Sequence, residues 1–98
     1  GGPSPAGARV LRMELEEFSQ LFDSPQASRG VLRVRATLLR AGPGGESLVA
    51  QRTVVASSPA PTPDAAGGVR ALTVAAQSAI TQLDDWVQQT QAALPTRP

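Results

Sequence analysis

The chain lacks five residue types on which much of protein chemistry depends. Cys, His, Lys, Tyr and Asn do not occur among its 98 residues. The absence of Cys excludes disulfides, thiolate nucleophiles and Cys-based metal sites within the chain. The absence of His and Lys leaves the Ser and Thr hydroxyls without the usual bases that activate a nucleophile. We therefore expect no catalytic activity, no cofactor and no metal centre.

Aromatic residues are scarce, and the charges are nearly balanced. Phe18, Phe22 and Trp86 are the three aromatic residues, and nine Arg stand against eight acidic residues for a net charge of +1. A nucleic-acid-binding domain normally clusters basic residues and adds aromatic side chains that stack on bases. We expect no nucleic-acid partner, because neither feature is present. No apolar run approaches the roughly 18 residues of a membrane-spanning helix, so none is expected.

The length of the chain fits one small domain. The Gly, Pro, Ser and Ala residues over positions 1–8 predict a disordered lead, and residues 95–98 form a predicted tail. A single domain is therefore expected over residues 9–94. The first residues, Gly1-Gly2-Pro3 without a Met, are typical of an internal or processed piece of a longer protein.

Three segments alternate apolar and polar residues, as half-buried strands do. They cover residues 9–18, 31–40 and 47–57. A turn centred on Asp23-Ser24-Pro25 is predicted between the first two segments, because Asp and Ser close local turns and Pro fixes φ. The Gly42-Pro43-Gly44-Gly45 segment predicts a hairpin between the second and the third. The pattern therefore predicts an antiparallel meander.

One register of the first hairpin satisfies both faces of the sheet. Pairing Leu11 with Leu38 aligns the apolar residues of the two strands. The same register creates two opposite-charge pairs on the other face, each contributing roughly 0.2–1 kcal/mol: Glu14 with Arg35 and Glu16 with Arg33. The third strand is expected to continue the meander with Leu48 opposite Leu38 and Ala50 opposite Ala36.

A long helix is predicted over residues 64–94, after a Pro-rich connector that neither a helix nor a central strand accepts. Asp64 is a suitable N-cap, and Pro95 would end the helix. Its apolar residues recur mostly at spacings of three and four, so they are expected to cover the sheet: Ala65, Val69, Leu72, Ala76, Ile80, Leu83, Trp86, Val87 and Leu94. The predicted fold is α+β, a three-stranded antiparallel meander with one C-terminal amphipathic helix on one face.

The acidic residues have two interpretations. Glu14, Glu16 and Glu17 carry oxygens that a cation accepts, but the Arg residues opposite them favour ion pairs. Asp84 and Asp85 are adjacent on the predicted helix, so their side chains diverge by about 100° and cannot share a substrate as a catalytic pair does. A solvated helix face is the better account of these two residues.

Arg52 is the anomaly of the pattern, because the expected register places it on the face that the helix covers. Burial of an unpaired guanidinium is costly. In one interpretation, a bulge or the length of the side chain places the charge at the sheet edge. In the other, Arg52 forms a buried ion pair with Asp84, with Asp85 or with a segment outside this chain. The weakly charged outer face of the helix is either ordinary surface or a packing face; it comprises Ala75, Ala79, Gln82, Gln88, Gln89 and Gln91.

Several stretches together resemble one bacterial family, the ABC-type transport auxiliary lipoproteins. The resemblance covers about residues 9–90 and matches the C-terminal half of family members. It rests on strand patterns, a turn, a connector and an Ala-rich helix ending near a Trp: LRMELEEF at 11–18, FDSPQASR at 22–29, VLRVRATLL at 31–39, LVAQR at 48–52, DAAGGV at 64–69 and Trp86.

The resemblance implies a role for the parent protein. Family members work with MCE-type, paraquat-inducible lipid-transport systems, and an acylated Cys near their N-terminus anchors them at the periplasmic face of a membrane. It therefore implies a periplasmic lipoprotein, anchored in the outer membrane, whose partner is an MCE-type transport protein. Self-association, as in a structural oligomerisation module, is a separate hypothesis. The resemblance also implies that this β-β-β-α unit belongs to a larger α/β domain with a mixed sheet.

We expect the chain to act by protein–protein contact. Candidate contact residues are chosen because the predicted sheet exposes them: Asp23, Ser24, Pro25, Gln26 and Arg29 at the turn, and Arg33 and Arg35 on the charged face. The alternative is a carrier of a lipid or of another small apolar ligand, which requires an apolar cavity. The predicted core supplies only enough apolar residues for a packed interior.

Overall fold

The computed structural model describes residues 8–93, which form three strands followed by one helix. The elements are β1 (Arg9–Ser24), β2 (Ala27–Gly42), β3 (Gly45–Pro59) and α1 (Ala65–Ala93). The predicted α+β architecture is confirmed. The predicted lead, apart from Ala8, lies outside the described residues, as do the predicted tail and the stop at Pro95.

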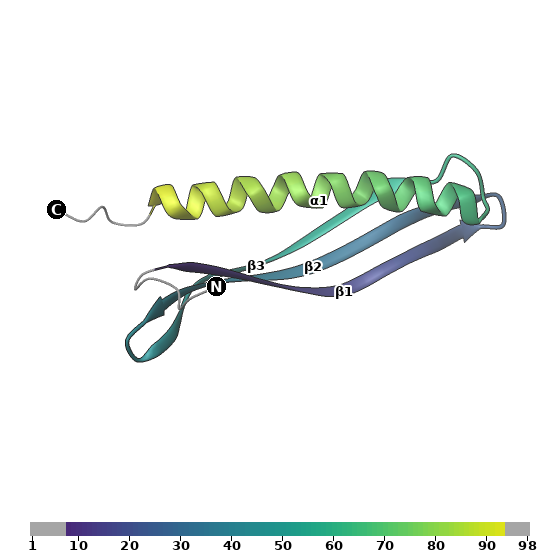
Figure 1. The fold of residues 1–98 in the computed structure, drawn as a ribbon. Coiled ribbons are helices and arrows are strands. Elements are labelled where there is room, and N and C mark those ends of the chain that lie inside the picture. Colours follow the sequence, from purple (N-terminus) through teal and green to yellow (C-terminus); the bar gives the residue numbers. More distant parts are fainter. Residues whose placement is uncertain (1–7, 94–98) are drawn as a thin grey trace.

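The strands form one antiparallel sheet in the order β1-β2-β3, and α1 runs along one face of it (Figure 1). The strands are longer than predicted. Residues 19–24, expected to belong to a connection, continue β1 and pair with the start of β2. Only Pro25 and Gln26 remain between the strands, so the hairpin is tight. The long strands and the 29-residue helix produce an elongated molecule of 57 × 26 × 19 Å.

The predicted register of β1 and β2 is confirmed from Leu11, opposite Leu38, to Leu15. A bulge then interrupts it, and Glu17 instead of Glu16 lies opposite Arg33. The predicted Glu16–Arg33 pair is therefore wrong. The extra residue reverses the alternation of every side chain that follows it. As a result Phe18 lies opposite Leu32, on the same face as α1, and not opposite Val31 on the other face.

The predicted register of β2 and β3 is wrong by two residues. Leu38 lies opposite Ala50, and Ala36 lies opposite Arg52. Two features cause the shift. Gly42 pairs directly with Gly45 in a two-residue turn, which moves the register by one residue, and a bulge at Val49, between the pairs Leu39–Leu48 and Leu38–Ala50, moves it by one more. Gly45 has a φ of 109°, a left-handed conformation that glycine adopts without strain. The length of the turn fixes the register of the strands that follow.

Small residues bring α1 close to the sheet. Ala71, Ala75 and Ala79 are almost completely buried, whereas Val69 and Ile80 are 65% and 66% exposed. Our expectation that Ala75 and Ala79 lie on the outer face is therefore wrong, as is the burial of Val69 and Ile80. A stripe of Ala lets the helix backbone approach the strands more closely than branched side chains permit.

The core lies between α1 and only two of the strands. Its buried residues come from β2, β3 and α1: Leu32, Ala36, Leu38, Val54, Ala56, Ala75, Ala79, Leu83 and Trp86. No residue of β1 is buried. A helix with its side chains is about 10–12 Å wide, and neighbouring strands lie about 4.8 Å apart. One helix therefore covers about two strands, and the side chains of β1 stay open.

Asp64 begins the helix, as predicted. Its Oδ1 accepts hydrogen bonds from the Gly67 amide at 2.8 Å and from the Thr62 hydroxyl at 2.6 Å. The carbonyl oxygen of Asp64 accepts a bond from the Gly68 amide at 2.9 Å and another from the Gln20 side chain at 2.8 Å. Asp64 thus joins the start of α1 to β1. The bonds from Thr62 and Gly67 hold the pKa of Asp64 below its ordinary value.

The contact of Gly30 with α1 gives the first prediction. A Cβ at Gly30 would lie 2.7 Å from the Leu72 backbone nitrogen, whereas one at Gly44 would meet nothing within 4 Å. We expect Gly30→Ala to lower the free energy of unfolding by about 1–3 kcal/mol, because the helix must move away. Gly44→Ala should change it by less than about 0.5 kcal/mol. Urea unfolding monitored by circular dichroism measures both, and equal effects would contradict this packing.

The cap gives the second prediction. Because the pKa of Asp64 is lower in the folded protein than in the unfolded chain, the carboxylate stabilises the fold above its unfolded pKa. This stabilisation is lost as the pH falls through the folded pKa. Asp64→Asn keeps a good N-cap but does not titrate. We expect the stability advantage of the parent protein over this variant to shrink as the pH falls below about 4. Urea titrations at a series of pH values test it, and an advantage independent of pH would contradict it.

Candidate interaction surfaces

The sheet face opposite α1 carries most of the charged residues that the sequence singled out. The Arg35 guanidinium donates to Glu16 Oε2 at 2.7 Å, with the Arg35 side chain 43% exposed and that of Glu16 28%. The hydrogen bond and the charge of Glu16 raise the pKa of Arg35. Glu14 lies opposite Arg35, as predicted, but the ion pair of Arg35 is formed with Glu16, which the bulge brings within reach. Within residues 8–93, no three acidic residues lie close enough together to hold a metal ion.

Arg33 differs from Arg35 in having no ion-pair partner among residues 8–93. It is exposed and lies between Glu17 of β1 and Val55 of β3. The side chain of Glu17 instead accepts a hydrogen bond from Ser19 at 2.7 Å. Arg33 is therefore the basic residue of this face that is most available to a partner.

The predicted contact turn forms the tip of the first hairpin. Arg29 Nε lies 3.4 Å from Asp23 Oδ2, and Ser24 Oγ accepts a bond from the Gln26 amide at 3.3 Å. Pro25 and Gln26 are exposed at the tip, which lies at the same end of the molecule as the start of α1 (Figure 1). Residues 29, 33 and 35 alternate along β2, so the structure places these three Arg residues along one face.

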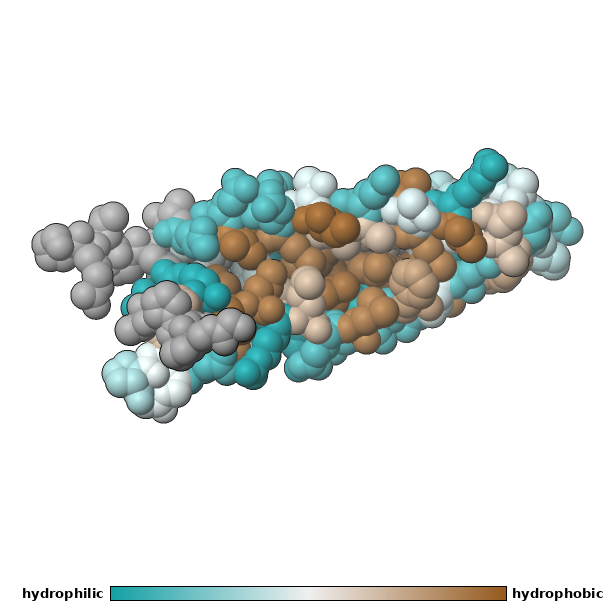
Figure 2. Space-filling view, viewed as in Figure 1, coloured by the Kyte–Doolittle hydropathy of each residue, from teal (hydrophilic) through white to brown (hydrophobic). Residues whose placement is uncertain are grey.

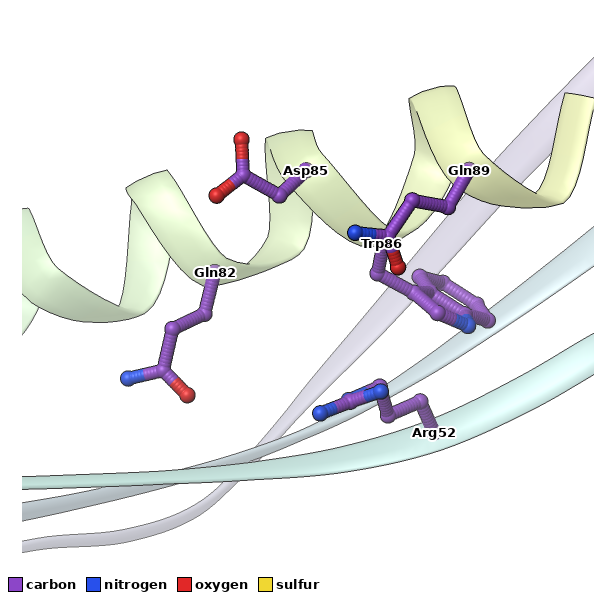
Figure 3. Close-up of a pocket in the computed structure, with 5 residues that line it drawn as sticks. All are labelled: Arg52, Gln82, Asp85, Trp86 and Gln89. Atoms are coloured by element: carbon purple, nitrogen blue, oxygen red, sulfur yellow. The ribbon is translucent and has the colours of Figure 1, made fainter. Parts of the chain in front are cut away.

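Arg52 lies on the helix side of the sheet, at the exposed edge formed by β3. Its side chain extends beneath Trp86, and the guanidinium lies beyond the edge of the ring (Figure 3). The two residues line an open hollow of about 180 Å³, together with Gln82, Asp85 and Gln89. Arg52 is exposed, and neither Asp84 nor Asp85 comes within ion-pair distance of it. The proposed buried ion pair is thus not formed, and the side chain reaches solvent at the edge.

This geometry gives the third prediction. Arg52→Met keeps an apolar side chain of similar length in the hollow beside Trp86 and removes the charge. We expect the free energy of unfolding to change by less than about 0.5 kcal/mol, as at an ordinary surface position. Thermal and urea unfolding measure it, with Asp85→Asn as the matched change on the helix. A loss of about 3 kcal/mol or more in either variant would show that the charge takes part in a buried ion pair.

Large apolar side chains line the exposed part of the helix-side surface, where sequence reasoning expected a covered core. We call this set the apolar face. Leu11, Met13, Leu15 and Phe18 of β1 are 41%, 59%, 62% and 56% exposed. Figure 2 shows this apolar region between α1 and β1, the strand closest to the viewer. Ile80 and Val69 of α1 belong to it as well. Gln82 and Asp85 lie on the flank of the helix beside β3, whereas Ile80 and Val69 lie on the other flank, toward β1.

Sequence reasoning missed the apolar face because it treated all three strands as covered by the helix. The predicted number of strands and helices could have revealed it. Three strands are wider than one helix, so one strand must remain uncovered. The helix itself adds to the opening. Its Ala stripe lies against β2 and β3, which leaves the larger residues Val69 and Ile80 on the side of β1.

No protein-family model, no curated protein and no solved structure matches this chain. Over residues 8–93, no helix is both long and apolar enough to cross a membrane.

Proposed function

We propose that the chain is a non-enzymatic accessory domain of a bacterial ABC-type lipid-transport system and that it acts by binding other proteins. In this proposal the parent protein is a periplasmic lipoprotein anchored in the outer membrane, and its partner is an MCE-type transport protein. The transport assignment is supported by the resemblance over residues 9–90. The binding role is supported by the surfaces of the domain itself.

The observation that carries the binding role is the apolar face. Four neighbouring side chains of β1 are each at least 41% exposed, and all four are Leu, Met or Phe. Soluble monomers rarely expose a large contiguous apolar patch, and such patches mark contacts with proteins or other ligands. The charged sheet face on the other side offers a second, polar surface. A domain with two open surfaces of different chemistry suits an assembly component.

The carrier alternative has less support. Pockets for small ligands usually enclose about 300–1,000 Å³ and are mostly apolar. The hollow beside Arg52 is smaller, at about 180 Å³, and is lined largely by polar side chains. The large apolar residues instead lie on an open surface. This arrangement suits a flat protein contact better than enclosure of a lipid chain.

The fourth prediction concerns the charged face. Arg33→Glu reverses an exposed charge without removing the Arg35–Glu16 pair. We expect it to weaken binding to the periplasmic domain of an MCE-type transport protein by roughly tenfold, mainly by slowing association. Arg70→Glu is the matched control, because it makes the same change at an exposed position of α1. Surface plasmon resonance with the folded proteins measures both variants.

The outcomes separate the role from the site. If Arg33→Glu, Arg70→Glu and the unmutated protein bind equally well, the proposed binding role stands, but the charged face is not the contact site. No binding by the folded parent protein would contradict the proposed role. In that case, lipid that co-purifies with the protein and is detected by mass spectrometry would favour the carrier alternative.

A further inference from the structure

Within residues 8–93, β1 forms one edge of the sheet and pairs with β2 alone. The backbone N–H and C=O groups on its other side are therefore open to a further strand. β3 is the second edge, but its helix-side residues Val54 and Ala56 are buried under α1. β1 thus combines an open edge with an uncovered apolar face. A partner strand beside β1 would satisfy the backbone groups and shield the apolar side chains together.

The sequence of β1 is complementary to itself in one antiparallel arrangement. Two copies related by a two-fold axis keep like faces together only if the axis passes through a residue, because side chains alternate along a strand. An axis at Arg12 would place Arg12 opposite its own copy. An axis at Glu14 would do the same to Glu14. An axis at Met13 instead places Arg12 opposite Glu14 of the second copy, and this opposite-charge pair occurs twice.

The same axis matches the apolar residues. Leu11 lies opposite Leu15 of the second copy, and the two Met13 residues face each other at the centre. Directly opposed side chains in such a pair have Cβ atoms about 4.5–5.5 Å apart, close enough for contact. These three residues are 41–62% exposed in the single chain. The pairing therefore covers the part of the apolar face that precedes the bulge.

We propose that two copies of this chain associate through their β1 edges, antiparallel about a two-fold axis at Met13, to form a continuous six-stranded sheet. This association goes beyond the transport role and does not depend on it. The bulge at Glu16 limits regular pairing to about Leu11–Leu15. An interface this short belongs to the small class, below about 1,200 Å². The dimer is therefore in equilibrium with the monomer and depends on concentration.

The existing contacts of the charged residues permit this exchange. Arg12 forms an ion pair with Glu46, in which the two side chains are 63% and 34% exposed. Exposed ion pairs contribute little to stability. Arg12 can therefore turn toward the second copy at small cost. Glu14 takes part in no ion pair within residues 8–93, so its carboxylate is available.

The fifth prediction tests the axis by charge exchange. Sedimentation equilibrium of the full chain over a wide concentration range gives the dimer dissociation constant. We expect Arg12→Glu to raise it at least tenfold, because two acidic pairs replace two ion pairs. The double variant Arg12→Glu with Glu14→Arg reverses both charges and should return the constant to near the parent value. Circular dichroism confirms that each variant is folded. A monomer at all concentrations, or a double variant no better than the single one, would overturn the proposal.

Crosslinking gives a second measurement that needs no charge change. The chain has no Cys, so Met13→Cys introduces one thiol. At the two-fold axis the facing Cα atoms lie about 4.5–5.5 Å apart, within the range that a disulfide spans. We expect mild oxidation to convert this variant to a covalent dimer. Leu48→Cys on β3 is the matched control, since Leu48 is 64% exposed and Met13 is 59% exposed. Equal crosslinking of the two variants would overturn the proposed axis.

Discussion

The close contact between α1 and the strands β2 and β3 determines which surfaces the molecule offers. This contact depends on residues with little or no side chain. Gly30 leaves room for the backbone of α1, and Ala71, Ala75 and Ala79 are buried against the strands. A helix held this closely over two strands leaves most of the third uncovered. The exposure of β1 therefore follows from the same packing that forms the core.

The sequence predicted the elements better than their alignment. Alternation is a local property, so it correctly separated the two faces of β1 up to Leu15. The bulge was missed because local alternation continues through it. It places Phe18 on the side of α1, and the position of α1 depends on tertiary packing. The register of β3 was wrong because it depends on the exact length of the turn before Gly45 and on a bulge at Val49, neither of which alternation reveals. The helix face was misassigned because hydrophobicity favours Val69 and Ile80, whereas close packing selects Ala75.

The candidate contact residues were predicted more reliably by face than by partner. Arg33 and Arg35 lie on the exposed face, because strand alternation alone decides it. Which acid reaches Arg35 could not be predicted, since the bulge brings Glu16 and not Glu14 into hydrogen-bond distance. For Arg52 the sequence left two alternatives. The edge position of β3 favours the solvated one, because a long side chain at an edge reaches water without a buried partner.

The two open surfaces differ in how far the chain satisfies them by itself. On the charged face, Arg35 is paired with Glu16 and Arg29 with Asp23, so much of the charge is already neutralised. On the apolar face, the side chains of β1 have no comparable partner among the described residues. Apolar burial contributes about 25 cal/mol per Å², whereas exposed ion pairs contribute little. The apolar residues of β1 therefore supply the free energy for association, and the alternating charges beside them select the register. Both follow from one alternating sequence, because each strand residue faces either the helix side or the charged side.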